Sequence, residues 1–452
     1  MSSDPSNDRS ASALFPRLAP VRQLLPESPV LDISAVVREE LGPVARRLKP
    51  GARVAVAVGS RGISRLQELV AAVLECLRVT GARPFVVPAM GSHGGGTAEG
   101  QIALLGEYGV TEAALGVPIR ACMDVEEIGH TPEGLPVVAS VEAVRADAIV
   151  LVNRIKPHTD FGGDLGSGLL KMLVVGLGKR VGAARFHAAA SRLGYLAVLR
   201  RFGAVASRRL PLLAGLAIVE NQRHDPARLA VVLPEDLESR ESALCAEARA
   251  LMPRLPFDTV DLLIVDQMGK NLSGTGMDPA IIGRMIHGYS LAEDVEHRTP
   301  HVRRLFVRDL TPESHGNAIG LGLADFTTTR LIAAMDRAVT VTNALTALSL
   351  QGAKIPIAFA TDREAIAAAL TTLALPDPRQ ARVVRIADTL SVERFEASAA
   401  LLADAELRPD LEVLGPAQPL AFGEDGNLAI HLPRGGGGAI CSPLKRASLA
   451  QW

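Results

Sequence analysis

The chain has 452 residues, enough for two or more domains with separate hydrophobic cores. Its formal net charge is −1, which excludes a strong basic field and therefore argues against nucleic acid or an anionic membrane as a partner. Aromatic residues are only 3% of a chain that is 48% hydrophobic, so its cores must be built mainly from Ala, Val, Leu and Ile, as in layered α/β domains.

Cysteine usage and the lengths of the apolar runs bear on the cell compartment. The four cysteines are scattered without Cys-x-x-Cys spacing, which favours free thiols in a reducing compartment. No apolar run approaches the roughly 18 residues of a membrane helix, and no hydrophobic signal segment follows the polar start MSSDPSNDRSAS. We therefore expect a soluble, cytoplasmic protein with a disordered lead over residues 1–15 and a mobile tail over residues 431–452.

In the first half of the chain, apolar runs of strand length alternate with amphipathic helical patterns. Ser64 and Gln67 form a predicted capping box that starts a helix after the first strand. A glycine-rich loop over residues 90–96 follows the second strand. The strands are expected at residues 53–58, 84–88, 136–139 and 148–152. This alternation predicts a parallel or mostly parallel sheet.

A second α/β pattern begins after residues 251–257, where two prolines follow a charged helix and mark a domain boundary. Further strands are expected at residues 260–265, 305–307, 355–359 and 382–386. The sequence thus predicts an α/β protein of two domains, each a mostly parallel sheet flanked by helices, with the site in the cleft between them. We expect the N-terminal catalytic and cofactor domain over residues 16–250 and the C-terminal domain over residues 256–430.

Three polar residues of the first domain follow predicted strands directly. They are Arg61, His93 and His158. Because the carboxyl ends of parallel strands carry the ligand site in such sheets, we expect these side chains to converge on one face. A single histidine in a glycine loop more often hydrogen-bonds to backbone than acts in catalysis. Three strand ends that carry such groups together favour a functional site.

The stretch from Asn153 to His187 is rich in glycine and has a lysine, Lys171, inside the apolar run of residues 169–175. A lysine buried there would lose its charge, pair with an acid or be used covalently. Alternatively, it extends its ammonium to water from the flank of a helix. The residues themselves leave both interpretations open. The flanking histidines His158 and His187 favour a site.

The polar groups suit chemistry on a small carboxylate. Arg61 and Lys270, if they face one cleft, would hold a carboxylate. Two histidines on opposite sides of a substrate can act as acid and base near neutral pH, and a third can ligate a borderline metal. The segment Gly-Leu-Gly-Lys-Arg at 176–180 is not a P-loop, and the sequence has neither a Gly-x-Ser-x-Gly elbow nor His-Glu-x-x-His.

At these residues the chain resembles the nickel-dependent lactate racemase family, over roughly residues 20–430 in the order of the motifs. Arg61 lies where the family has an arginine that contacts substrate. His93 in Gly-Ser-His-Gly and His158 in Lys-Pro-His match the two acid/base histidines of the family. Val58 stands where the family has an aspartate, three residues before the arginine.

The resemblance also assigns the cofactor positions. Lys171 matches the lysine that the family joins through a thioamide to a nickel-pincer nucleotide, pyridinium-3,5-bisthiocarboxylic acid mononucleotide nickel. His187 matches the histidine that ligates the nickel. Gln267 and Lys270 match the glutamine and lysine of the second domain that reach the substrate.

The resemblance implies a 2-hydroxy-acid racemase or epimerase. In the implied reaction the cofactor takes hydride from the substrate, and a histidine takes the hydroxyl proton. The resulting 2-keto acid accepts hydride back on either face. The implied partners are a small hydroxy acid and the proteins that make the cofactor. The alternative is a family member without the cofactor that acts as a small-anion binding protein or catalyses different chemistry.

Overall fold

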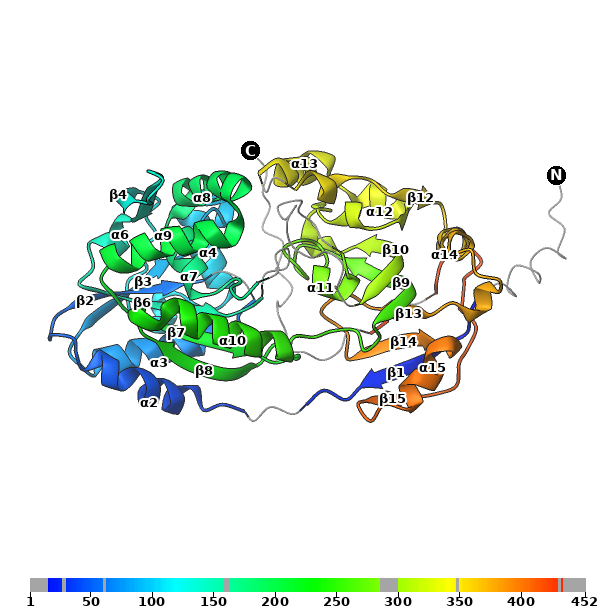
Figure 1. Ribbon diagram of the computed structural model, residues 1–452, viewed down its shortest axis with the longest axis horizontal. Coiled ribbons are helices and arrows are strands. Elements are labelled where there is room, and N and C mark those ends of the chain that lie inside the picture. The colour runs from blue at the N-terminus through cyan, green and yellow to red at the C-terminus, as the bar shows by residue number, and fades with distance from the viewer. Residues whose placement is uncertain are drawn as a thin grey trace. The chain divides into compact units, whose positions relative to one another are not determined.

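The structure, a computed structural model, describes residues 15–26, 30–59, 62–157, 163–284, 300–346, 349–429 and 432–433. These residues form two compact units: residues 30–252 make one, and residues 15–26 with 253–433 make the other. We call them the N-unit and the C-unit and describe each by itself (Figure 1). Most of the predicted lead and tail lies outside the described residues.

The N-unit is built on a five-stranded sheet with the order β3-β2-β6-β7-β8. Its first four strands run parallel, and β8 pairs antiparallel with β7. The strands are β2 (Arg53–Val58), β3 (Arg83–Pro88), β6 (Ala148–Arg154), β7 (Leu212–Glu220) and β8 (Pro226–Val232). The predicted strand at 136–139 lies outside this sheet, because β5 (Pro136–Ser140) forms a separate antiparallel ribbon with β4 (Val125–His130).

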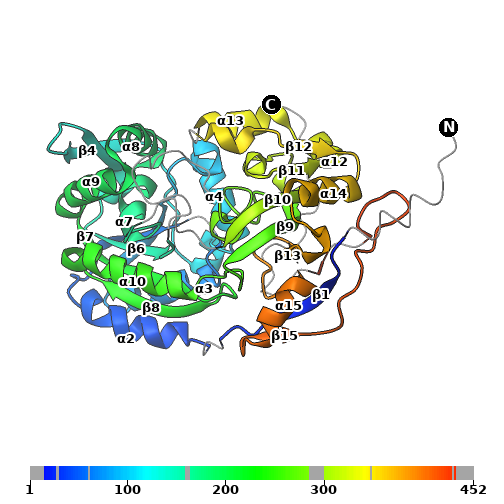
Figure 2. The ribbon, with the colours of Figure 1, turned by 45° about the vertical axis from the view of Figure 1, so that its right-hand side comes forward.

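Helices cover both faces of this sheet because its strands are apolar on both faces. Along β2, Val54 and Val56 pack into one core cluster, and Ala55 and Ala57 pack into the other, as expected since successive side chains point to opposite faces. Helices α2 (Ile33–Ala45), α3 (Leu66–Arg78) and α4 (Ala98–Glu107) contribute to the first cluster. The second cluster draws on α7 (Leu169–Lys171), α8 (Lys179–Leu193), α9 (Tyr195–Arg209) and α10 (Leu237–Leu251) (Figure 2). The short helices are α5 (Glu112–Leu115) and α6 (Val141–Val144).

The predicted capping box at Ser64 is wrong. Helix α3 begins at Leu66, and its N-cap residue is Arg65, which has a left-handed backbone with φ of 55° and makes no side-chain cap bond. The amide of Ser64 donates instead to the Glu220 carboxylate at 3.1 Å. A contact made across the sheet therefore replaces the local cap.

The C-unit is built on an eight-stranded sheet with the order β12-β11-β10-β9-β13-β14-β1-β15. Neighbours from β12 to β13 pair parallel, and the remaining pairs are antiparallel. The longest strands are β9 (Thr259–Met268) and β10 (His301–Leu310). The shorter ones are β11 (Phe326–Thr328), β12 (Ile357–Phe359), β13 (Val383–Ile386), β14 (Arg394–Ser398) and β15 (Leu411–Val413).

Helices also cover both faces of the C-unit sheet. α11 (Pro279–Ile282), α12 (Thr329–Ala334) and α15 (Ala399–Glu406) pack on one face, and α14 (Asp362–Thr372) packs on the other. Helix α13 (Arg337–Thr346) follows α12. The predicted α/β class, with mostly parallel sheets flanked by helices, is confirmed. Within the described ranges, no helix has both the length and the apolar character needed to cross a membrane.

The first strand differs from the predicted domain plan. β1 (Leu18–Gln23) falls within the N-terminal domain predicted over residues 16–250, but it pairs with β14 and β15 of the C-unit. Its antiparallel register sets Leu18 opposite Ser398 and Val21 opposite Val413. The reason is that the partner strands of β1 lie near the other end of the chain, and local sequence patterns do not reveal such distant partners.

A buried ion-pair network crosses the C-unit sheet at Asp266, which is fully buried in β9. Its carboxylate accepts from Arg308 at 2.8 Å and from two nitrogens of Arg385 at 2.9 Å. Arg308 also donates to the fully buried Asp362 at 2.8 Å, and Arg385 donates to Glu396 at 3.1 Å.

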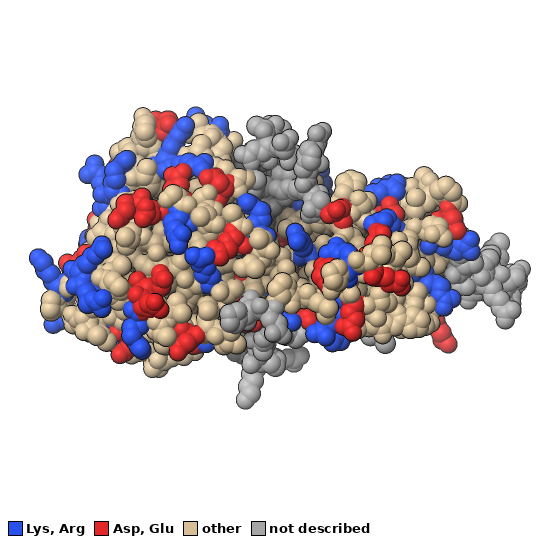
Figure 3. Space-filling view, turned by 60° about the horizontal axis from the view of Figure 1, so that its bottom comes forward, with Lys and Arg blue, Asp and Glu red and all other residues tan. Residues whose placement is uncertain are grey.

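On the surface drawn in Figure 3, charges of both signs are interspersed, in keeping with the net charge of −1.

Candidate functional site

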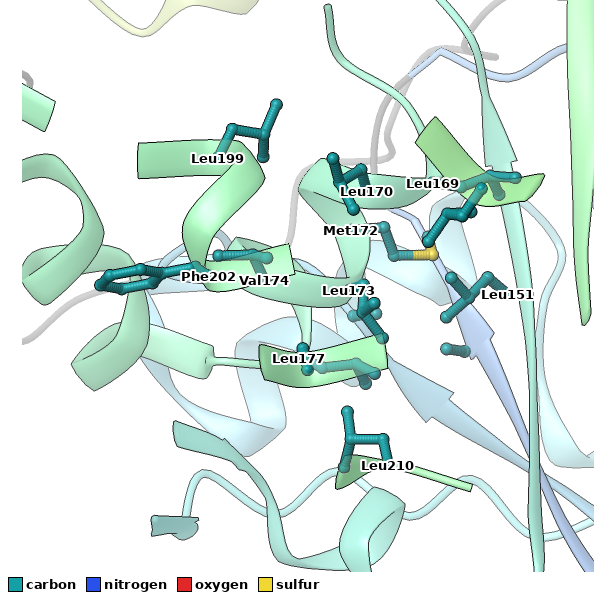
Figure 4. Packing of buried hydrophobic residues seen from close by; sticks show 14 of the residues in the cluster. Leu151, Leu169, Leu170, Met172, Leu173, Val174, Leu177, Leu199, Phe202 and Leu210 are labelled. Atoms are coloured by element: carbon teal, nitrogen blue, oxygen red, sulfur yellow. The ribbon is translucent and has the colours of Figure 1, made fainter. Parts of the chain in front are cut away.

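Lys171 lies in a helical segment whose other side chains are anchored in the core. It ends α7 and leads into a π-helical turn over Met172–Gly176, after which α8 begins at Lys179. The neighbouring leucines, methionine and valine are buried against Leu151 and Phe202 (Figure 4). Single π-helical turns are rare and often mark functional sites. The apolar side chains thus fix the segment, and Lys171 lies on its remaining face.

Lys171 is half-buried, so its amine is not enclosed in the core. Its Nζ donates to the hydroxyl of Ser167 at 3.2 Å and lies 5.7 Å from the centre of the Tyr195 ring. Of the two interpretations that the sequence left open, the structure supports the lysine at a helix flank. The predicted role of Lys171 in binding a cofactor is untouched by this, since attachment requires an accessible amine.

An aromatic cluster lies between Lys171 and His187. The Tyr195 ring, with Lys171 near its face, meets the ring of Phe186 edge-on with centroids 5.2 Å apart. Phe186 in turn meets the imidazole of His187 at 5.6 Å, also edge-on. Phe186 is fully buried, and His187 is half-buried. Both residues predicted to bind the cofactor therefore border one aromatic cluster.

The loop that carries His93 packs directly on the π-helical turn. The amide of Gly91 donates to the carbonyl of Gly176 at 3.0 Å. A Cβ atom at Gly176 would come within 2.6 Å of the Ala89 carbonyl oxygen, and Gly91 has φ of +59°. Only glycine allows the two backbones to approach so closely here. The loop that carries His93 is thus hydrogen-bonded to the segment that carries Lys171.

A buried pair that the sequence analysis missed holds the same loop. Lys179 is fully buried, and its Nζ donates to the Pro88 carbonyl at 2.6 Å and to the side-chain oxygen of Gln101 at 3.1 Å. The side-chain nitrogen of Gln101 donates to the carbonyl oxygens of Gly91 at 3.0 Å and His93 at 3.4 Å. Desolvation lowers the pKa of Lys179 to about 8. The sequence shows this lysine only as part of Gly-Leu-Gly-Lys-Arg, and no local signal marks it as buried.

A second missed residue, Glu241 of α10, holds the other end of the Lys171 segment. Its carboxylate accepts from the amide of Leu170 at 2.8 Å. A Cβ atom at Gly168 would lie 2.2 Å from its Oε1. Asn153, at the end of β6, donates to the Gly168 carbonyl at 2.8 Å. Burial raises the pKa of Glu241 to about 7, against the lowering effect of the helical amides.

The substitution Glu241→Gln should change how stability depends on pH. Because the pKa of Glu241 is raised on folding from 4.5 to about 7, the folded wild type binds a proton more tightly than the unfolded chain, and this stabilisation is lost as pH rises from 4.5 through 7. In the wild type the free energy of unfolding should fall by roughly 3 kcal/mol over this pH range, at about 1.4 kcal/mol per pKa unit. The Glu241→Gln variant should not show this fall. Urea unfolding at several pH values measures it.

The matched control is Glu238→Gln, which removes an exposed carboxylate from the same helix. It should retain the pH slope of the wild type. Identical slopes for wild type and Glu241→Gln would mean that Glu241 is charged throughout this range in the folded protein.

The strands that precede the predicted site residues of the N-unit are neighbours. β3, β2 and β6 lie side by side and run parallel, so their carboxyl ends meet at one edge of the sheet. At this edge a Cβ atom on Gly59 would come within 2.5 Å of the Asn153 side-chain oxygen and 3.1 Å of Met172. Arg61 and His158, which follow β2 and β6, lie outside the described residues.

In the C-unit, the structure places Gln267 and Lys270 at the carboxyl end of β9. Both are half-buried. The Lys270 amide donates to the Ser314 hydroxyl at 2.9 Å, and its Nζ donates to the Gly274 carbonyl at 2.7 Å, within the same loop. The amide of Gln267 donates to the Ala387 carbonyl at 2.9 Å, which ties it to β13. The meeting of these residues with those of the N-unit in a cleft stays a prediction.

Among the residues that the structure describes, no group of three or more His, Cys, Asp or Glu could hold a metal ion. The imidazole of His187 lies beside the aromatic cluster, edge-on to the ring of Phe186.

Comparison with known proteins identifies a family domain within the N-unit. Residues 28–193 match the model of the lactate racemase N-terminal domain. A crystal structure of a Thermotoga maritima protein from a structural genomics consortium is 16% identical, covers 63% of this chain and 72% of its own, and has a TM-score of 0.45. The structure of the lactate racemase apoprotein of Thermoanaerobacterium thermosaccharolyticum is 14% identical in sequence. The match covers 89% of this chain and 92% of that one, with a TM-score of 0.43. No curated protein matches the chain.

Proposed function

Because residues 28–193 of this chain match the lactate racemase N-terminal domain, we propose that the protein is an isomerase that interconverts the stereoisomers of a small 2-hydroxy acid. The cofactor of this proposal is the nickel-pincer nucleotide, attached at Lys171. One observation carries it: Lys171 and His187 border the same aromatic cluster. We place the enzyme in the cytoplasm, dependent on the proteins that make the cofactor.

The residues present fit such a group. Lys171 offers a half-buried primary amine for an amide-type linkage, and His187 offers an imidazole nitrogen, a ligand that suits nickel. The rings of Tyr195 and Phe186, which meet edge-on, pack between these two residues. When bound, the cofactor provides a hydride acceptor. This matters because the α-hydrogen of a hydroxy acid is too weakly acidic for histidine to remove as a proton.

The chain's own groups bind the substrate and move its hydroxyl proton. His93, whose loop is hydrogen-bonded to the Lys171 segment, would take this proton in one direction and return it in the other. His158 does the same from the opposite side, so that either stereoisomer finds a base. The proposed substrate-binding groups are Arg61, whose two-pronged guanidinium suits a carboxylate, and Gln267 and Lys270. Water exclusion would strengthen each of these charge interactions.

Cofactor attachment is the direct test. Purified from a host that makes the pincer, the protein should show added mass on the peptide with Lys171 and about one nickel per chain. His187→Ala should lose nickel but keep the added mass, because the thioamide linkage does not involve the imidazole. Arg185→Met, an exposed neighbour in the same helix, is the control and should keep both.

An unmodified Lys171 peptide would contradict the proposal, provided that a lactate racemase expressed in the same host is loaded. That result would favour the alternative of a small-anion binding protein that uses Arg61, Lys270 and the glycine-rich loops.

A further inference from the structure

Lys179 is a buried lysine in an unusual backbone conformation. Its exposed fraction is 0%, and its φ is +55°, in the left-handed region that favours glycine. Such residues persist only where surrounding structure holds them, and they cluster at functional sites. A buried ammonium is also costly unless its protons are used in hydrogen bonds. Both features call for specific partners.

Those partners lead to His93. Lys179 donates to Pro88, the last residue of β3, and to Gln101 of α4, which is also fully buried. Gln101 uses its other end to donate to the main-chain carbonyls of Gly91 and His93. The side chain of Gln101 therefore connects Lys179, the first residue of α8, to the His93 loop through hydrogen bonds.

Lys179 lies between the two residues proposed to bind the cofactor. It lies eight residues after Lys171 and eight before His187, in the helical segment that carries both. The Gly91–Gly176 hydrogen bond joins the same loop to the same segment. The loop is thus tied at two points to the part of the chain proposed to hold the cofactor.

We propose that Lys179 and Gln101 are positioning residues, which hold the main chain at His93 against the helical segment of Lys171 and His187 and so aim His93 at the substrate. The inference rests on the proposed function for its catalytic part. Neither side chain touches substrate, because both are enclosed in the N-unit core. Their effect is on the turnover step, since a misplacement of about 1 Å can cost roughly 10²-fold in rate.

The test uses Gln101→Glu and Gln101→Met in the full-length protein. The glutamate keeps an oxygen acceptor for Lys179 but removes both N–H donors to the loop, whereas methionine removes all three bonds. A merely structural partner of Lys179 would tolerate glutamate. A positioning residue would not. Arg185→Met is the matched control.

The first measurement is amide hydrogen exchange of residues 90–97 in protein without cofactor. Exchange there should rise about tenfold in both Gln101 variants, as expected for the loss of a hydrogen bond, and remain unchanged in Arg185→Met. Wild-type exchange in both Gln101 variants would overturn the proposal, whether or not the protein is a racemase.

The second measurement is steady-state kinetics of the loaded enzyme. Both Gln101 variants should have a kcat that is lower by roughly 10²-fold and a KM that is little changed. Their nickel content should equal that of the wild type. Faster exchange with unaltered kcat would overturn the catalytic part. If wild type itself neither loads cofactor nor turns over, the proposed function fails, while the exchange result still decides whether Gln101 and Lys179 hold the loop.

Discussion

Replacement of His93 by alanine should lower the interconversion of 2-hydroxy-acid stereoisomers by about 10²–10⁴-fold in both directions. The size of this loss in rate follows from the proposed role of His93, which removes the hydroxyl proton in one direction and returns it in the other. Because the substitution cannot change the equilibrium between the stereoisomers, kcat/KM must fall by the same factor in both directions. Initial rates from each stereoisomer measure it, with nickel content and the mass on Lys171 checked to be those of wild type.

His158→Ala should have a loss of similar size, because one base on each side of the substrate is needed for racemisation. The control is His315→Ala, which removes an exposed histidine of the C-unit and should leave the rates unchanged. Near-wild-type turnover of both single variants, on a substrate that wild type converts, would show that His93 and His158 are structural. The substitution His93→Ala leaves the main-chain hydrogen bond from Gln101 in place, so the two effects can be separated.

Asp266→Asn should destabilise the C-unit by about 3–5 kcal/mol. The carboxylate is fully buried between two arginines and also accepts from the amide of Leu432 at 2.8 Å. Asparagine has the same shape but no charge, and its NH₂ would face guanidinium donors. Arg308 and Arg385 would then lose their shared counter-ion in a buried site. Urea unfolding of the full-length protein measures the effect.

The control for this prediction is Asp404→Asn, which breaks the more exposed pair with Arg382. It should cost less than about 1 kcal/mol, as surface pairs usually do. Because the chain has two compact units, unfolding is to be followed for each. Asp266→Asn should shift the transition of the C-unit. An effect no larger than that of Asp404→Asn would mean that the buried network adds no net stability.

Only part of the candidate site could be predicted from sequence. Glycine-rich loops after apolar runs correctly indicated strand ends, and β3, β2 and β6 are neighbours, as three converging groups require. The sequence left open whether Lys171 is buried or lies at a helix flank. In the structure Lys171 is half-buried, and Lys179 is the lysine that is fully buried. The two lie eight residues apart in equally apolar, glycine-rich sequence. Local composition cannot separate them, because burial depends on where the π-helical turn directs each side chain.

The sequence by itself determined the α/β class and the strands β2, β3, β6, β9, β10, β12 and β13, because hydrophobic period and glycine or proline punctuation are local properties of the chain. It did not reveal β7 and β8 of the N-unit sheet or the antiparallel strands of the C-unit sheet. Tertiary structure alone decided the contacts between distant segments. It pairs β1 with β14 and β15 across some 370 residues of chain. It also brings Glu241 to the amide of Leu170 and Gln101 to the carbonyl of His93. Such contacts depend on how helices pack on the sheet, since a buried polar group takes whichever partner that packing supplies.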